Sequence, residues 1–112
     1  SCMNIDSKTE NGIAIVSLEG NLDTNTSPDA QSHLDGLMDG GDLKILIDFT
    51  KVDFVASSGL RVLLATAKRL TGEGGSLRIC GLNESVNEVF EMSGFDTILN
   101  VFSSRDDALS GF

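Results

Sequence analysis

Residues 43–67, LKILIDFTKVDFVASSGLRVLLATA, contain the two elements that decide the fold. The first seven residues are almost continuously apolar, which is typical of a strand in the middle of a sheet that is flanked by helices. After a short connection that contains Asp53, leucine and alanine recur at helical spacing until Gly72 ends the pattern. We therefore predict a central strand over 43–49 and a helix that begins at the serine pair 57–58.

Strand and helix patterns also alternate on the amino-terminal side of this unit. The β-branched stretch at 13–18 predicts a strand, and a weaker strand at 3–10 is expected to pair with it. Ser27 as a cap and Pro28 at the first helical position predict a helix that the glycines at 40–41 end.

The same alternation continues to the carboxyl end. We predict a strand at 76–82, a helix capped by Asn83, a last strand at 97–102 and a short terminal helix in which Ser104 and Asp107 fit the start pattern. Strands that alternate with helices predict one α/β domain with parallel crossovers. Its mixed central β-sheet should have four to five strands, with about four α-helices packed on it.

Composition limits the kinds of protein that this chain can be. At 112 residues the chain has the length of one domain, and 40% hydrophobic residues can fill a core without a disulfide or a metal. Seventeen acidic against eight basic residues give a net charge of −9, which repels nucleic-acid phosphates and anionic membrane surfaces. The apolar runs are far shorter than the ~20 residues of a membrane helix, and a secretory signal is missing. We expect a cytoplasmic protein with no nucleic-acid partner and no membrane insertion.

Residues that support metal or nucleophilic chemistry are scarce. Cys2 and Cys80 have no zinc-ligand spacing, and His33 is the only histidine, so neither a zinc site nor a serine-histidine-acid triad is indicated. Cys80 stands in an apolar stretch and is interpreted as a core thiol. We predict no catalytic residues, no metal and no cofactor, and hence no enzyme. Ser1 and Cys2 precede Met3, which we expect to be the natural start after a remnant of expression.

The candidate site is expected in the connections that lead from the carboxyl end of a strand to the next helix, because α/β sheets bind ligands at the carboxyl ends of their strands. Two such segments are 19–26, which contains Asp23, and 53–60, which contains Ser57 and Ser58. One serine can cap the helix by accepting a backbone hydrogen bond. Only one cap is needed, however, and no glutamate or glutamine completes a capping box. Two roles for the serine pair therefore stay open, a helix cap and a hydroxyl that is modified for regulation.

A phosphoryl group on one of these hydroxyls would meet unpaired backbone N–H groups and the positive end of a helix dipole. The fold would therefore tolerate the modification. A docked partner would not, because about two negative charges would enter the contact. Since a hundredfold loss of affinity needs only ~2.8 kcal/mol, such a charge is large enough to act as a switch.

Three stretches of the chain together resemble the STAS domains of bacterial anti-sigma factor antagonists. They are LEGNLDTNTS at 18–27, DFTKVDFVASSGLRVLLATAKRL at 48–70 and VFEMSGFDTILNVFSSRDDAL at 89–109. The resemblance implies a non-catalytic protein that binds an anti-sigma factor and so frees a sigma factor for transcription. It also implies that the anti-sigma factor is a serine kinase that uses ATP, and that a separate serine phosphatase reverses the modification.

By position, the resemblance makes Ser57 the phosphorylated hydroxyl, with Ser58 as the second choice. It further implies that Asp23 lies beside this serine and that Gly59 lets the partner's backbone come close. The partner-binding residues that it predicts are Asp23, Ala56, Ser57, Ser58, Gly59 and Leu60.

Two residues depart from the family pattern. Ala56 precedes the serine pair and Asn21 precedes the LD dipeptide, where many antagonists carry an acidic residue. Two alternatives are therefore kept beside the antagonist. One is an accessory subunit of a transporter or other signalling complex that is not phosphorylated. The other is a small-ligand or nucleotide-binding module that holds a phosphate at the helix start.

Overall fold

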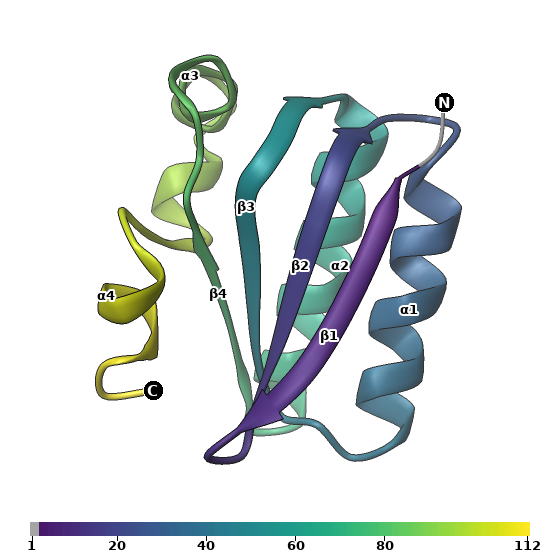
Figure 1. Ribbon diagram of the computed structural model, residues 1–112, viewed down its shortest axis with the longest axis vertical. Helices are drawn as coiled ribbons and strands as arrows, with labels where there is room; N and C mark the ends of the chain where they lie inside the picture. Colours follow the sequence, from purple (N-terminus) through teal and green to yellow (C-terminus); the bar gives the residue numbers. More distant parts are fainter. Residues whose placement is uncertain (1–2) are drawn as a thin grey trace.

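Strands and helices alternate along the computed structural model, which describes residues 3–112 (Figure 1). The predicted remnant of expression, Ser1 and Cys2, lies outside the described residues. Within 3–112 the elements are β1 (Asn4–Glu10), β2 (Ile13–Leu22), α1 (Ser27–Asp39), β3 (Lys44–Val55), α2 (Ser57–Gly72), β4 (Ser76–Cys80), α3 (Glu84–Met92), the 3₁₀ turn η1 (Phe95–Thr97), β5 (Asn100–Phe102) and α4 (Arg105–Leu109). The prediction of a mixed α/β domain is confirmed.

The sheet is mixed, with strand order β1-β2-β3-β4-β5. β1 and β2 form an antiparallel hairpin, and Asn11 and Gly12 at its turn both have positive φ, as the tight turns of twisted hairpins require. β2, β3, β4 and β5 are parallel neighbours, and a helix joins each successive pair. β3 is therefore the central strand, as the apolar run predicts.

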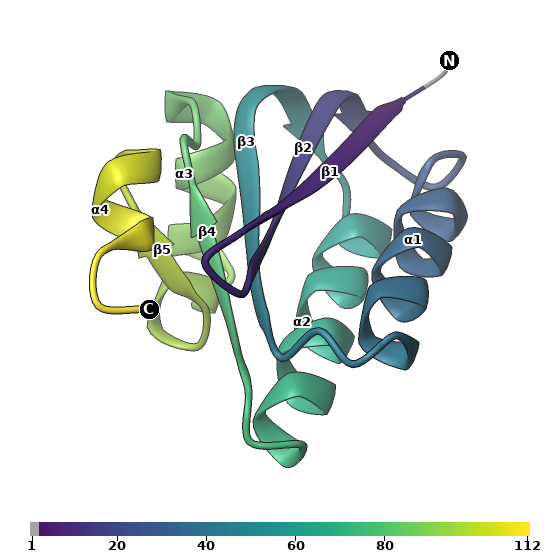
Figure 2. The same ribbon diagram turned by 60° about the horizontal axis from the view of Figure 1, so that its bottom comes forward.

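Alternate residues of the parallel strands face two separate cores. Ile45 and Ile47 point into the large core under α1, α2 and α3. Leu46 points to the opposite face, where Cys80 and the terminal helix residue Ala108 are also buried. In Figure 2, α1 and α2 lie on one side of the sheet, and α4 lies beside β4 and β5. Cys80 is fully buried, which confirms that it is a core thiol, and this burial raises the pKa of the thiol to about 11.

The two strands that lead to the candidate site are longer than predicted. β2 continues to Leu22 and β3 to Val55, so Asp53 belongs to a strand and only Ala56 separates β3 from α2. Pairing between the two strands resumes after register shifts at Ser17/Glu19 and Gly20/Asn21. These backbone hydrogen bonds extend each strand through polar residues that local patterns assign to a connection.

Helix starts confirm two of the three predicted caps. The side chain of Asn83 accepts from Val86 N, and the hydroxyl of Ser104 accepts from Asp107 N. The cap predicted for α1 is wrong, because the residue before that helix is Thr26 and the Ser27 hydroxyl does not accept from the helix. Over residues 3–112, every helix is too short or too polar to cross a lipid bilayer.

Candidate functional site

The carboxyl ends of β2 and β3 lie side by side at one edge of the sheet. Leu22 pairs with Val55, and the backbone N–H of Ala56 donates to the Leu22 carbonyl over 2.9 Å. Asp23 follows the first of these strand ends, and Ser57 follows the second. The structure therefore brings together the two predicted strand-to-helix connections, 19–26 and 53–60, although more than 30 residues separate Asp23 from Ser57 in the chain.

Ser57 is the first residue of α2, and its side chain is exposed. The residue that precedes the helix is Ala56, and no side chain caps this helix. The interpretation of the serine pair as a helix cap is therefore wrong. Among residues 3–112, the Ser57 hydroxyl has no side-chain hydrogen-bond partner, so it is open to an incoming group.

Ser58 differs from its neighbour in both burial and contacts. Its half-buried hydroxyl lies 3.4 Å from the Thr24 hydroxyl and 3.4 Å from the Ser27 hydroxyl. These contacts join the start of α2 to the start of α1. Ser58 thus has a structural role that Ser57 lacks.

Gly59 and Leu60 follow the serines and are both buried. A β-carbon at Gly59 would lie 2.7 Å from Leu22 Cγ. The close approach that requires a glycine here is made by the end of β2 in the same chain. Gly59 therefore has an internal packing role, and the expectation that it also admits a partner's backbone stays a prediction.

Asp23 shapes the loop between β2 and α1. Its carboxylate accepts hydrogen bonds from the backbone N–H groups of Asn25 at 2.9 Å and Thr26 at 3.1 Å. Its carbonyl accepts from both the backbone N–H and the hydroxyl of Ser27. The hydrogen bond from Thr26 N–H is the main cause that lowers the pKa of Asp23, so the side chain is a carboxylate at neutral pH.

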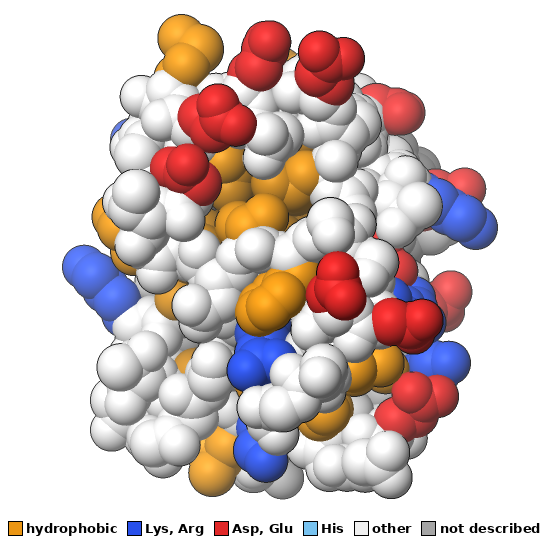
Figure 3. Space-filling model, turned by 90° about the vertical axis from the view of Figure 1, so that its left-hand side faces the viewer, with side chains coloured by type: hydrophobic (Ala, Val, Ile, Leu, Met, Phe, Trp, Pro, Cys, Tyr) orange, Lys and Arg blue, Asp and Glu red, His pale blue; other side chains and the backbone are white. Residues whose placement is uncertain are grey.

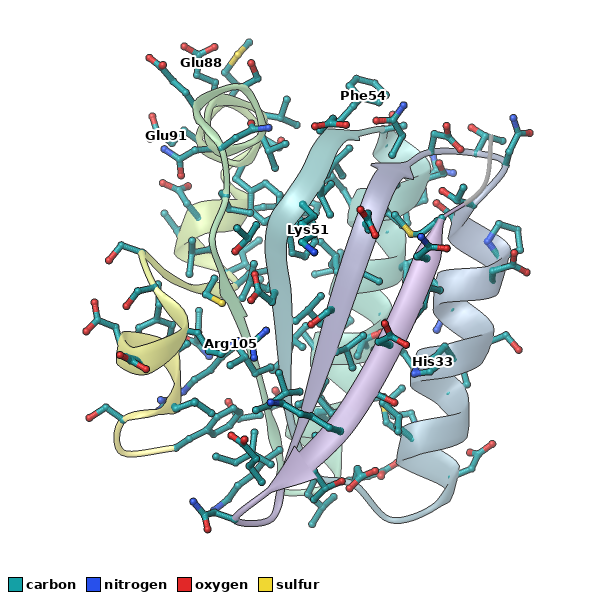
Figure 4. The ribbon with its side chains drawn as sticks, in the orientation of Figure 1. His33, Lys51, Phe54, Glu88, Glu91 and Arg105 are labelled. Atoms are coloured by element: carbon teal, nitrogen blue, oxygen red, sulfur yellow. The ribbon has the colours of Figure 1, made fainter. Side chains whose placement is uncertain are left out.

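An apolar groove of about 690 Å³ opens beside Ser57, between α2 and α3. We name it the α2–α3 groove; its lining includes Phe54, Ser57, Leu60, Arg61, Val89 and Met92. Phe54 is 51% exposed and Met92 88% exposed, which is unusual for large apolar side chains in a small domain. Figure 4 shows Phe54 at the upper end of β3, on the same edge as the start of α2.

Sequence reasoning missed the α3 wall of this groove. Val89 and Met92 belong to α3, and only the fold places them against residues of α2. Phe54 lies at the end of β3, and Arg61 lies one turn beyond Ser57 in α2. Nothing in the local sequence says that these four side chains line one surface.

The charge of the surface is unevenly distributed. In Figure 3, acidic side chains gather on the upper part of the side formed by α3 and α4. Glu88 and Glu91 point outward from α3 in Figure 4. A smaller polar hollow of about 250 Å³ lies on the open face of the sheet, where Asp48 and Arg105 form an ion pair with an N–O distance of 2.7 Å. No group of three or more metal-binding side chains occurs within 3–112.

These features define a class of protein: a small α/β domain that presents an exposed serine and an apolar groove at one edge of its sheet. The STAS domain family model matches residues 4–108. The chain therefore belongs to the STAS domain family, as the resemblance in its sequence indicates.

Similar sequences span nearly all of this chain. BtrV of Bordetella bronchiseptica, a candidate anti-sigma factor antagonist, is 36% identical over 101 residues, which are 90% of this chain and 87% of BtrV. The anti-sigma F factor antagonist of Paenibacillus polymyxa is 28% identical over 109 residues, which are 96% and 93% of the two chains.

Solved structures show the same fold. An anti-sigma factor antagonist from Mycobacterium paratuberculosis superposes with a TM-score of 0.90 at 23% identity, over 97% of this chain and 92% of the other. The Bacillus cell fate determinant SpoIIAA in its phosphorylated form superposes with a TM-score of 0.73 at 18% identity, over 95% and 96% of the two chains.

Proposed function

We propose that this chain is an anti-sigma factor antagonist that phosphorylation of Ser57 switches off. In its unmodified form it binds an anti-sigma factor and so releases a sigma factor for transcription. Relatives over nearly the full length carry the antagonist name, and a solved structure of the same fold is that of SpoIIAA in its phosphorylated form; both support the proposal. The observation that carries the proposal is the exposed hydroxyl of Ser57, which lies beside the apolar groove at the start of a helix that no side chain caps.

The partner-binding surface in this proposal is the sheet edge that contains Asp23, Ser57 and the α2–α3 groove. Phe54 and Met92 supply exposed apolar area, and a central apolar patch with a polar rim is typical of protein interfaces. Ser57 stands at the rim of this patch. A docked anti-sigma factor would therefore cover the hydroxyl without requiring that the domain change shape.

Phosphorylation acts on the complex more than on the fold. No side chain caps α2, so its first backbone N–H groups are available to a phosphate, and the helix dipole favours negative charge there. In the complex the same phosphate would be desolvated against an apolar partner surface. A loss of ~2.8 kcal/mol weakens binding a hundredfold, which is sufficient to release the partner.

In this scheme the chain supplies an acceptor and no catalytic machinery. The Ser57 oxygen attacks the γ-phosphorus of ATP on the anti-sigma kinase, the bond from that phosphorus to the bridging oxygen of ADP breaks, and the hydroxyl proton passes to a base of the kinase. A separate phosphatase returns the serine by hydrolysis. Because Ala56 replaces the acidic residue common before the serine, the kinase must recognise Ser57 through other contacts.

The experiment that tests the proposal uses the anti-sigma kinase encoded by the same genome. The wild-type chain, Ser57→Ala and Ser58→Ala are incubated with the kinase and ATP, and phosphopeptides are mapped by mass spectrometry. We expect label at Ser57 in the wild type and in Ser58→Ala, and none in Ser57→Ala. Titration calorimetry should show that Ser57→Asp binds the anti-sigma factor more weakly than the wild type. Unmodified Ser57 together with undiminished binding by Ser57→Asp would contradict the switch. Recovery of a transporter ATPase in place of an anti-sigma factor in a pull-down would favour the accessory subunit that is not phosphorylated.

A further inference from the structure

Arg61 differs from the other arginines of the chain in having no partner within the described residues. Arg69 pairs with Asp39 at 2.8 Å and Glu73 at 3.0 Å, and Arg105 pairs with Asp48. Arg78 donates to the carbonyls of the terminal segment and stacks on two phenylalanine rings. Over residues 3–112, Arg61 makes neither an ion pair nor a side-chain hydrogen bond, and it is exposed.

The position of Arg61 sets it beside the proposed phosphorylation site. It follows Ser57 by four residues in α2, so the two side chains lie on the same face, one turn apart. Both line the α2–α3 groove. A guanidinium at this spacing can reach a phosphate on the serine, and its planar fork of donors suits the oxygens of phosphates and carboxylates alike.

Neither the helix nor its surroundings accounts for a cation at this position. The positive charge lies near the positive end of the helix dipole, where cations gain no stabilisation. The neighbouring groove residues Phe54, Val89 and Met92 are apolar. The chain has a net charge of −9, and Arg61 is unpaired among residues 3–112 and lies in an apolar groove, which points to an anionic group that arrives from outside.

We propose that Arg61 changes its anionic partner when the switch operates. While Ser57 is unmodified, Arg61 pairs with a carboxylate on the segment of the anti-sigma factor that fills the groove. After phosphorylation, Arg61 pairs with the phosphate one turn away and is withdrawn from the interface. Phosphorylation then weakens the complex twice, because it adds negative charge and also removes the cation that the partner needs. This inference rests on the proposed function and names the residue that responds to the modification.

The proposed pairing of Arg61 with a phosphate on Ser57 is tested without a kinase or an anti-sigma factor. Phosphoserine is placed at position 57 by genetic encoding, and its second ionisation, near pH 6 in free phosphoserine, is followed by ³¹P NMR. A neighbouring cation favours the dianion and lowers this pKa. We expect a lower phosphate pKa in the wild-type background and in Lys68→Gln than in Arg61→Gln. Lys68 is the matched control, because it is an exposed cation farther along α2. Equal values in all three proteins would overturn the pairing.

The carboxylate half is tested by the affinity of the unphosphorylated chain for the anti-sigma factor. We expect Arg61→Gln to weaken binding about tenfold and Arg61→Glu to weaken it further, with Lys68→Gln unchanged. Circular dichroism should show the same fold for all variants, because both positions are exposed. Equal affinities of the wild type and Arg61→Gln would overturn this half while leaving the antagonist function intact. If the wild type does not bind the anti-sigma factor, the proposed function fails, and the carboxylate pairing fails with it.

Discussion

Gly59 packs directly against Leu22. A β-carbon on Gly59 would lie 2.7 Å from Leu22 Cγ and 2.9 Å from the Leu22 carbonyl oxygen, both closer than real side chains approach. The same carbonyl oxygen accepts a hydrogen bond from Ala56 N–H. The first turn of α2 is therefore held against the end of β2, and this contact sets where Ser57 stands relative to Asp23.

Replacing Gly59 with alanine should destabilise the domain. Because Leu22 is fully buried and its backbone is part of the sheet, neither can move aside cheaply, and we expect a loss of about 1–3 kcal/mol in the free energy of unfolding. Urea denaturation measures it. Gly36 in α1 is the control, because nothing lies within 4 Å of its missing β-carbon. Gly36→Ala should raise stability by about 0.5–1 kcal/mol, and equal effects of the two substitutions would contradict the packing role of Gly59.

Loss of the Asp23 carboxylate should loosen the start of α1. Asp23→Ala removes the acceptor for the backbone N–H groups of Asn25 and Thr26, so we expect a lower melting temperature and faster amide hydrogen exchange in this loop. Asp23→Asn keeps an acceptor oxygen and should be milder. Thermal unfolding followed by circular dichroism compares the two, and a melting temperature of Asp23→Ala equal to that of the wild type would show that the loop does not depend on this side chain.

The ion pair between Asp48 and Arg105 should make stability depend on pH in the acid range. Burial alone would raise the pKa of Asp48, but hydrogen bonds from Thr50 and from Arg105 outweigh it and lower the pKa below 3.8. Above about pH 4 the carboxylate is ionised in both folded and unfolded chains, so its full contribution to stability is present. As the pH falls toward the lowered pKa of the folded state, the unfolded chain binds the proton first and the contribution is lost.

Comparison with Asp48→Asn isolates this effect from the other acidic residues. Urea denaturation at pH 7 should show the wild type to be more stable, and the difference between the two proteins should shrink below about pH 4. A difference that stays constant from pH 7 to pH 3 would contradict the assignment.

Cys80 should be unreactive in the folded protein. Its thiol is fully buried, and a pKa of about 11 in place of 9.0 corresponds to roughly a hundredfold less thiolate. In a Cys2→Ser background, which leaves Cys80 as the only thiol, a disulfide reagent at pH 8 should label the native protein far more slowly than the urea-unfolded chain. Similar rates in the two states would mean that this core opens readily.

Much of the fold follows from local patterns. The order of strands and helices, the central position of β3 and the caps at Asn83 and Ser104 agree with the structure, because each depends on hydrophobic periodicity or on hydrogen bonds between residues three apart. The predicted lengths of β2 and β3 were wrong, because both strands extend farther than the apolar pattern indicates. Polar residues interrupt the apolar pattern of both carboxyl ends, and pairing between the two strands keeps these ends extended.

By itself, the sequence determined that this protein is an α/β domain and that its serine pair begins a helix. Only the tertiary structure decided that the two serines have different environments, that Gly59 packs against its own chain, and that α3 completes a groove beside Ser57. The physical reason is distance along the chain. The contact between Ser27 and Ser58 joins segments about 30 residues apart, and Ser57 and Met92 line one groove although a similar length of chain separates them. Only the packing of helices on the sheet brings these segments together.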